Sequence, residues 1–221
     1  MSTMLDDSEF DRALVGAAFS LAAERGWTGL TLGEAARTAG LSLAHARERF
    51  PGRLALLHRF GCLLDTDALA DPPAEGSARD KLFDVLMRRF DGLQAHRAGV
   101  LSLMRALPFD PPAAALLACG TQRSMRWMLD AVGVDVTGFR GELRTKALVG
   151  VWLWGVRAWQ RDESADLSGT MAAVDTGLDR ADQFGGWTER HGPTARDTTT
   201  PNGDGPATAD VAQAPPGAQP V

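Results

Sequence analysis

The chain has 221 residues, a formal net charge of −5 and a sequence pI near 5.4. This charge differs from that of a general nucleic-acid coat protein, whose affinity comes from neutralising phosphates. The length suits one large domain, or a small domain joined to a larger one, with a substantial hydrophobic core.

The cysteines and the hydropathy indicate a soluble, cytoplasmic protein. Cys62 and Cys119 lie far apart within apolar helical patterns and have no metal-ligand spacing near them, so we expect buried free thiols in a reducing compartment. The N-terminal segment is acidic rather than basic and apolar, which argues against a signal peptide. The longest uninterrupted apolar run, residues 147–156, is too short to span a membrane.

The first expected helix begins near Asp7 or Ser8, either of which can cap it, and ends at Arg25–Gly26. Its apolar residues fall on one face, namely Phe10, Leu14, Ala17, Ala18 and Leu21. We expect this face to pack across the next two helices and to hold them in place.

Residues 28–60 predict two short helices joined by a tight turn and followed at once by a longer helix. Thr31 followed by Glu34 predicts a capping box, in which the threonine oxygen accepts from the third amide and the glutamate reaches back. Gly40 suits the left-handed residue that closes a helix, and Ser42 can cap a new one. This spacing is typical of a helix-turn-helix.

The second helix of this unit, residues 43–50, is short because Pro51 lacks an amide donor and Gly52 is flexible. A fourth helix is expected from Arg53 to about Ala70. Its inward side chains are expected to be Leu54, Leu57, Phe60 and Leu64.

The rest of the chain predicts a helical body after a loop at residues 71–76. Further helices are expected from Ser77, around residues 100–107, from Pro111 to Gly133, from Phe139 to Trp159, and from Asp166 or Ser168. No stretch of alternating β-branched residues interrupts them, so the predicted fold is all-α.

Three parts follow from this pattern. Residues 1–53 form a three-helix bundle with the helix-turn-helix, and residues 54–186 form an antiparallel helical body for ligand binding and dimerisation. Residues 187–221 are dominated by proline, glycine, threonine and alanine, which predicts a disordered C-terminal tail.

Five short segments between residues 26 and 57 carry a family resemblance. They are Gly26-Trp27-Thr28, Thr31-Leu32, Ala36-Arg37-Thr38-Ala39-Gly40-Leu41-Ser42, Phe50-Pro51-Gly52-Arg53 and Leu56-Leu57. With this pattern the chain resembles the N-terminal domain of TetR-family regulators. It departs from the family at Leu43, Arg47 and Arg49, where the family usually carries a lysine, a tyrosine and a histidine.

The resemblance implies a transcriptional repressor that binds double-stranded operator DNA as a homodimer. A small molecule that enters the body would shift the fourth helix and change the separation of the two reading helices, which must meet major grooves at a fixed spacing.

The residues expected to contact DNA are Thr31, Ser42, His45, Arg47, Arg49 and Arg53. Arg47 can pair bidentately with a guanine, and Thr31 stands at a helix N-terminus, which favours phosphate. Arg53 stands where the family carries a phosphate-contacting lysine. The alternative is a solvated helix face whose arginines pair with Glu48 and its neighbours.

Two further sets of residues are expected in the body. A pocket for a small apolar effector would be lined by Met104, Met125, Trp127, Met128 and Trp152, although such residues also serve as ordinary core. The helix over residues 139–159 is apolar nearly all round, so we expect its own body to cover one side and a second copy the other. The predicted C2 dimer interface contains Val151, Trp154, Ala158, Met171, Val174 and Leu178.

An alternative function follows from a second resemblance. Residues 159–166, Thr170-Met171 and Val174-Asp175 resemble the C-terminal part of the ubiquinone-biosynthesis accessory family, whose members share the TetR-like fold, do not bind DNA and hold an isoprenoid lipid. Leu43 favours this alternative, and so does the zero net charge of residues 1–60, which carry seven arginines and seven acidic residues. The polar, proline-rich tail disfavours it, because that family ends in a membrane-docking amphipathic helix.

The sequence predicts neither an enzyme nor a cofactor site. No spacing suggests a Ser/His/Asp or Cys/His catalytic arrangement, no phosphate-binding glycine loop follows a strand, and no metal-ligand pattern occurs.

Overall fold

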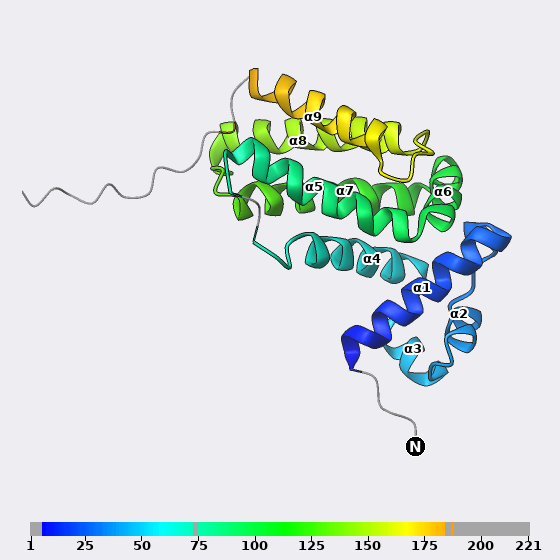
Figure 1. Ribbon diagram of the computed structural model, residues 1–221. Helices are drawn as coiled ribbons and strands as arrows, with labels where there is room; N and C mark the ends of the chain where they lie inside the picture. The colour runs from blue at the N-terminus through cyan, green and yellow to red at the C-terminus, as the bar shows by residue number, and fades with distance from the viewer. Residues whose placement is uncertain (1–5, 73–74, 184–186, 188–221) are drawn as a thin grey trace, which may run out of the picture. The chain divides into compact units, whose positions relative to one another are not determined.

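A computed structural model describes residues 6–72, 75–183 and Trp187 (Figure 1). The N-terminal helices are α1 (Asp7–Arg25), α2 (Leu32–Thr38), α3 (Leu43–Arg49) and α4 (Arg53–Ala68), with a 3-10 turn at Trp27–Gly29. The body contains α5 (Ala78–Ala95), α6 (Arg97–Ala106), α7 (Pro111–Ala131), α8 (Gly138–Trp159) and α9 (Ser168–Gln183), with a second 3-10 turn at Leu107–Phe109. These ranges contain no β-strand, so the predicted all-α fold is confirmed.

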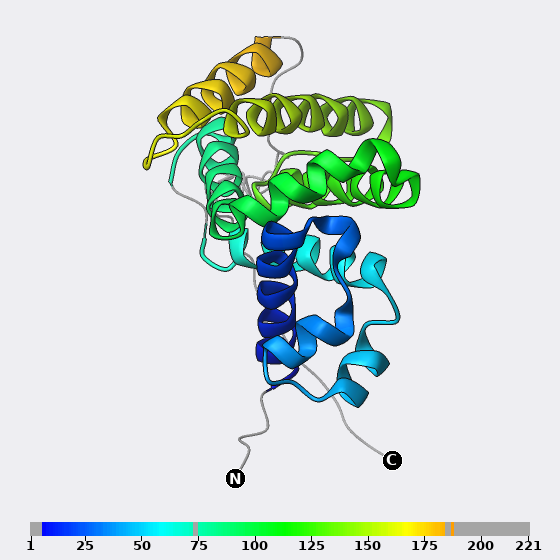
Figure 2. The ribbon, with the colours of Figure 1, turned by 90° about the vertical axis from the view of Figure 1, so that its right-hand side faces the viewer.

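Helix α1 organises the N-terminal helices, with α2 and α3 beside it (Figure 2). Its N-cap is Asp6, one residue before the predicted position, because Asp6 and Glu9 form the reciprocal capping box. The Asp6 carboxylate accepts from the Glu9 amide at 2.7 Å, and the Glu9 carboxylate accepts from the Asp6 amide at 3.2 Å. The two acidic side chains also lie at the end of the helix where the dipole favours negative charge.

Helix α1 also joins the N-terminal helices to the body through α6. A Cβ at Gly99 of α6 would lie 2.2 Å from the Phe19 carbonyl oxygen, so only glycine permits this approach of the two helices. Next to this contact, the Trp27 amide donates to the Ser102 hydroxyl at 2.9 Å. The turn that precedes α2 is therefore fastened to the body.

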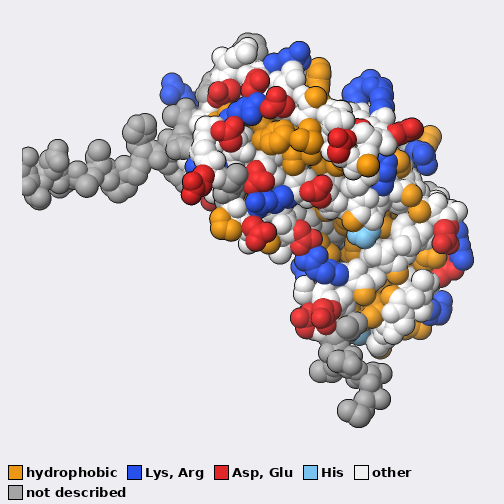
Figure 3. Space-filling model, viewed as in Figure 1, with side chains coloured by type: hydrophobic (Ala, Val, Ile, Leu, Met, Phe, Trp, Pro, Cys, Tyr) orange, Lys and Arg blue, Asp and Glu red, His pale blue; other side chains and the backbone are white. Residues whose placement is uncertain are grey.

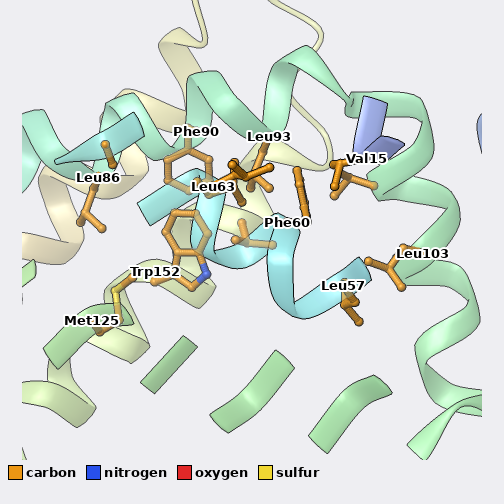
Figure 4. Close-up of a cluster of buried hydrophobic side chains, with 14 of the residues drawn as sticks. Val15, Leu57, Phe60, Leu63, Leu86, Phe90, Leu93, Leu103, Met125 and Trp152 are labelled. Atoms are coloured by element: carbon orange, nitrogen blue, oxygen red, sulfur yellow. The ribbon is translucent and has the colours of Figure 1, made fainter. Parts of the chain in front are cut away.

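The core of the body forms where α4, α5, α7 and α8 meet (Figure 4). Phe90 of α5 stacks on Trp152 of α8 with ring centroids 4.5 Å apart, and Met125 of α7 and Leu63 of α4 are buried nearby. Helix α4 therefore connects the helix-turn-helix end to this core.

The inward face of α4 differs in part from the prediction. Leu57, Phe60 and Leu64 are buried as expected, whereas Leu54 is exposed. The buried face is centred on the side of α4 that carries Leu56, and Leu54 in the first turn lies outside it.

Helices α5 and α9 meet on the face shown in Figure 3, where hydrophobic side chains gather among acidic and basic ones. A hollow there is lined by Phe83 and Met87 of α5 and by Met171 of α9. Arg79 of α5 forms ion pairs with Asp175 at 2.6 Å and Asp179 at 2.7 Å. These contacts hold α9 against α5.

Two expectations about single residues were wrong. Cys119 is exposed and Cys62 is half-buried, so neither thiol is fully buried, because both side chains lie away from the packed faces of α7 and α4. Trp187, which we assigned to the disordered tail, is buried, and its amide donates to the Asp182 carboxylate at 3.0 Å. The other residues of the predicted tail, 188–221, lie outside the described residues.

Among the described helices, none combines the length and the hydropathy needed to cross a bilayer. Within the same ranges, no group of three or more His, Cys, Asp or Glu side chains is placed to hold a metal ion.

Candidate nucleic-acid interface and ligand pocket

Helix α2 begins at Thr31, whose hydroxyl accepts from the Glu34 amide at 3.3 Å. The second half of the predicted capping box was wrong, because the Glu34 carboxylate forms an ion pair with Arg25 of α1 instead of reaching back to the cap. The helix therefore has a single side-chain cap, and Glu34 joins α2 to α1.

The turn between α2 and α3 has the predicted chemistry. Gly40 adopts a φ of +66°, and the Leu41 amide donates to the Ala36 carbonyl at 2.8 Å, as in a Schellman motif. The Ser42 hydroxyl then caps α3 by accepting from the His45 amide at 3.3 Å. These local bonds set the steep angle between the two helices.

Helix α3 presents one face to solvent and packs the other against α1. Ser42, Leu43 and Arg47 are exposed, and Ala46 is buried. Arg47 donates to the Pro51 carbonyl at 2.9 Å, which holds its guanidinium at the C-terminal end of α3. The outer face of α3 is therefore a short polar and apolar surface with one arginine, and it is free of contacts from the rest of the described chain that would cover it.

Two predicted DNA-contacting residues point toward α1 instead. The His45 ring lies against Phe10 with centroids 4.3 Å apart, and Arg49 donates to the Asp11 carboxylate from Nε and Nη2, both at 2.8 Å. Arg49 also pairs with Asp7 at 2.7 Å. These bonds raise the pKa of Arg49, chiefly through Asp11, so its charge is fixed and partnered. Both residues fasten α3 to α1.

A shallow hollow beside α3 brings several basic side chains together. It is lined by Thr31, Arg37, Arg47 and Arg53, from α2, α3 and the start of α4. Arg53 also donates to the Trp27 and Thr28 carbonyls at 3.1 and 3.3 Å. The N-terminus of α2 and these three arginines make a surface suited to phosphate.

Sequence reasoning missed Arg37 as a member of this surface. Arg37 lies four residues after Gly33, so both occupy the same face of α2, and Gly33 is in the first turn. That spacing was the available signal. It places the arginine over the N-terminal part of α2, next to Thr31.

A recess of the body that carries both acidic and basic groups lies between α4 and α7. It has a volume of about 320 Å³ and is lined by Leu57, His58, Gly61, Cys62, Asp65, Thr66, Leu69, Arg89, Leu116, Leu117, Gly120, Thr121, Arg123, Ser124 and Trp127. Of the predicted ligand-contacting residues, only Trp127 lines it. Met125, Met128 and Trp152 are buried in the core, and Met104 lies at α6, where its sulfur accepts from the Gln160 amide group.

The predicted dimer residues divide between two environments. Val151, Val174 and Leu178 are buried between α8 and α9 of the same chain, so they cannot meet a second copy, contrary to the expectation. Trp154 and Met171 are exposed, and Ala158 is half-buried. The physical reason is that α9 folds back on α8 and covers the stripe that we had assigned to the partner.

Helix α8 nevertheless has an exposed apolar stripe opposite its buried face. It consists of Phe139, Leu143, Gly150, Leu153 and Trp154, which recur at helical spacing. Leu153 is 57% exposed and Trp154 53% exposed. We call this set the α8 stripe.

The structure of the chain is similar to solved structures of TetR-family regulators. A TetR transcriptional regulator from Nitrosomonas europaea shares 19% identity over 78% of this chain and 98% of that chain, with a TM-score of 0.66. A TetR-family regulator from Streptomyces coelicolor shares 23% identity over 81% and 85%, with a TM-score of 0.56. A TetR regulator from Rhodococcus sp. RHA1 shares 18% identity over 80% and 97%, also with a TM-score of 0.56.

No protein-family model and no curated protein matches the sequence. At these identities the structural similarity establishes the fold. The chain therefore has the fold of TetR-type transcriptional regulators, as the sequence resemblance predicted.

Proposed function

We propose that the chain is a DNA-binding transcriptional regulator that acts in the cytoplasm as a repressor without enzymatic activity. It binds operator DNA as a homodimer and leaves it when a small ligand enters the body. The observation that carries this proposal is the orientation of α3, which is fastened to α1 by His45 and Arg49 while Ser42, Leu43 and Arg47 face solvent.

Three exposed residues at α3, Ser42, Leu43 and Arg47, have roles in DNA recognition. Arg47 reaches a base edge or a phosphate in the major groove, and Ser42 donates to a phosphate. Leu43 is 46% exposed and cannot donate, but it can contact a thymine methyl group. Arg37, Arg53 and Thr31 hold the backbone on the side of α2. His45 and Arg49 act as positioning residues.

Dimerisation is assigned to the α8 stripe rather than to the α8–α9 seam. Apolar side chains of this size are seldom exposed together on one helix face unless another surface covers them. Gly150 lies within the stripe, and a Cβ there would have no neighbour within 4 Å, so a second α8 can approach closely. Trp154 from the original prediction belongs to this stripe, and Ala158 follows it by one helical turn, whereas Met171 lines the hollow between α5 and α9.

Ligand release follows from the position of α4. One side of α4 lines the recess opposite α7, and its N-terminus begins directly after α3. Two reading helices must enter major grooves about 34 Å apart, so a small shift of α4 in each protomer prevents both from binding together.

Fluorescence anisotropy with the DNA that flanks the protein's own gene tests the proposal. Arg47→Ala and Arg37→Ala should each weaken binding, and Arg140→Ala serves as the control because Arg140 is exposed in the first turn of α8. If Arg47 reads a base, its loss should weaken binding about 5- to 100-fold and relax sequence preference. If Arg37 contacts a phosphate, its loss should reduce the salt slope by about one.

Equal affinities for the wild type, Arg47→Ala and Arg37→Ala would refute the proposed interface. The lipid-binding alternative predicts a different pair of results, namely an absence of salt-sensitive DNA binding and an isoprenoid lipid that co-purifies with the chain. Organic extraction of the purified protein, followed by mass spectrometry, separates the two functions.

A further inference from the structure

The recess between α4 and α7 has an apolar part and a charged part. Leu57 of α4 and Leu69, which follows the last residue of α4, face Leu116, Leu117 and Trp127 of α7 across it. Its charged part contains Asp65, Arg89 and Arg123, which leaves one excess positive charge when His58 is neutral. This division suits an amphipathic molecule better than a purely apolar one.

Arg89 is the unusual member of this lining. Arg89 is only 5% exposed, and its guanidinium carbon lies 5.0 Å from the centroid of the Trp152 ring. Nη1 forms an ion pair with Asp65, whereas Nε has no hydrogen-bond partner among the described residues. Burial lowers the pKa of Arg89 to about 10, so the group remains protonated at neutral pH. A buried cation with an unused donor is rare in folded proteins.

Asp65 cannot supply all the acceptors that Arg89 requires. Its Oδ2 already accepts from the Ser124 hydroxyl at 2.5 Å, and Ser124 is itself buried. A guanidinium presents five N–H donors in a fixed fork, which matches a second carboxylate bidentately. Arg89 therefore keeps at least one N–H donor that Asp65 does not satisfy.

Two glycines keep the recess open. Gly61 of α4 and Gly120 of α7 both line it, and a Cβ built at either position has no neighbour within 4 Å. Glycine in the middle of a helix is less favourable than alanine because it loses more backbone entropy on folding. Since nothing packs against these two positions, their effect is to widen the space beside Arg89.

We propose that this recess binds a small amphiphile with one carboxylate, whose anionic head pairs with Arg89 and whose apolar body lies between α4 and α7. The role of this amphiphile as the effector rests on the proposed function, whereas its binding to the recess does not. The carboxylate supplies the missing acceptor for Arg89 and balances the excess charge of Arg123. The apolar body contacts the leucines of both helices and the Trp127 ring at the rim.

Binding is measured by isothermal titration calorimetry on the full chain without DNA, with decanoate, decanamide and decylamine as probes of one chain length. We expect decanoate to bind at least 10-fold more tightly than decanamide and decylamine, because only decanoate brings a charge-assisted acceptor to Arg89. Gly120→Leu fills the space while leaving every charged group in place, so it should abolish decanoate binding. Ala118→Leu is the matched control, because Ala118 is an exposed position of the same helix that does not line the recess.

Arg89→Met tests the anionic preference, and the double variant with Asp65→Asn removes both charges when Arg89→Met alone does not fold. In either variant the preference for decanoate over decanamide should fall to near unity. Equal binding of the three probes to the wild type, no binding of decanoate, or undiminished binding by Gly120→Leu would each overturn the inference.

The DNA-binding experiment and the calorimetry can refute their two proposals separately. Decanoate binding without any DNA binding would refute the proposed regulator and leave the ligand class standing. DNA binding that decanoate does not alter, together with absent decanoate binding, would refute the ligand class and leave the regulator standing.

Discussion

The buried carboxylate of Asp11 on α1 accepts two hydrogen bonds from the guanidinium of Arg49 on α3, each at 2.8 Å. Asp11 is 1% exposed, and its Oδ2 also forms an ion pair with Arg59 of α4 at 2.6 Å. One acidic side chain thus joins three helices. Because α3 has only seven residues, it depends on such tertiary bonds more than on its own propensity.

Replacing Asp11 should therefore destabilise the N-terminal helices. Asp11→Asn removes the charge that two arginines share and should lower the free energy of unfolding by about 1–3 kcal/mol. The comparison is Asp67→Asn, which breaks the more exposed pair between Arg12 and Asp67 and should cost at most about 1 kcal/mol. Urea denaturation followed by circular dichroism measures both. Equal losses of unfolding free energy in the two variants would show that the burial of Asp11 does not strengthen its ion pairs.

Local signals explain which features of the fold could be predicted. The conformational effects of Gly40, Ser42 and the Pro51-Gly52 break extend over only a few neighbouring residues. The turn and the limits of the two helices therefore follow from the sequence. The all-α architecture follows from helical periodicity in the same way.

The directions of the site residues could not be predicted, because they depend on neighbours distant in sequence. The alternative to DNA contact was that the arginines of α3 pair with Glu48 and its neighbours. Arg49 does pair with an acidic residue, but that residue is Asp11 on α1 rather than Glu48. In a helix of two turns, the partner helix decides which side is buried. Similarly, periodicity marked Val174 as apolar, but only the return of α9 onto α8 shows that its own chain covers it.

Acid should weaken the connection between α8 and α9. The Asp162 carboxylate accepts from the Ser164 hydroxyl at 2.5 Å and from the Thr170 amide and hydroxyl at 2.7 and 2.8 Å. These bonds, that from Ser164 first, hold the pKa of Asp162 well below its ordinary value of 3.8. Since the folded pKa is lowered, the stabilisation is complete above the ordinary value and is lost as the pH falls toward the folded pKa.

Asp162→Asn is the variant that isolates this effect. At neutral pH it should lower the Tm by about 2–4 °C for each kcal/mol lost, and the difference from the wild type should shrink as the pH falls below about 4. Differential scanning calorimetry over a series of acidic buffers measures this. A difference that stays constant down to the acid limit would mean that the carboxylate charge has no part in the contact.

The same substitution should have opposite effects at two helical glycines. Gly99→Ala places a Cβ against the Phe19 carbonyl and should cost about 1–3 kcal/mol by forcing α6 away from α1. Gly120→Ala meets open space and should stabilise α7 by about 0.5–1 kcal/mol. Chemical denaturation of both variants gives the two signs. A loss at Gly120 similar to that at Gly99 would contradict the open space assigned to the recess.

The α8 stripe gives the last prediction, on the oligomeric state. Leu153→Glu introduces a charge at the centre of the proposed interface, and a buried unpaired carboxylate is costly, so the dimer should dissociate to monomers at micromolar concentration. Phe109→Glu is the control, because Phe109 is 87% exposed and lies outside the stripe. Sedimentation velocity distinguishes the two masses. If both variants remain dimers, the interface lies on another face. If Leu153→Glu is monomeric and folded, it should also lose most of its operator affinity, because one reading helix alone contacts half of the site.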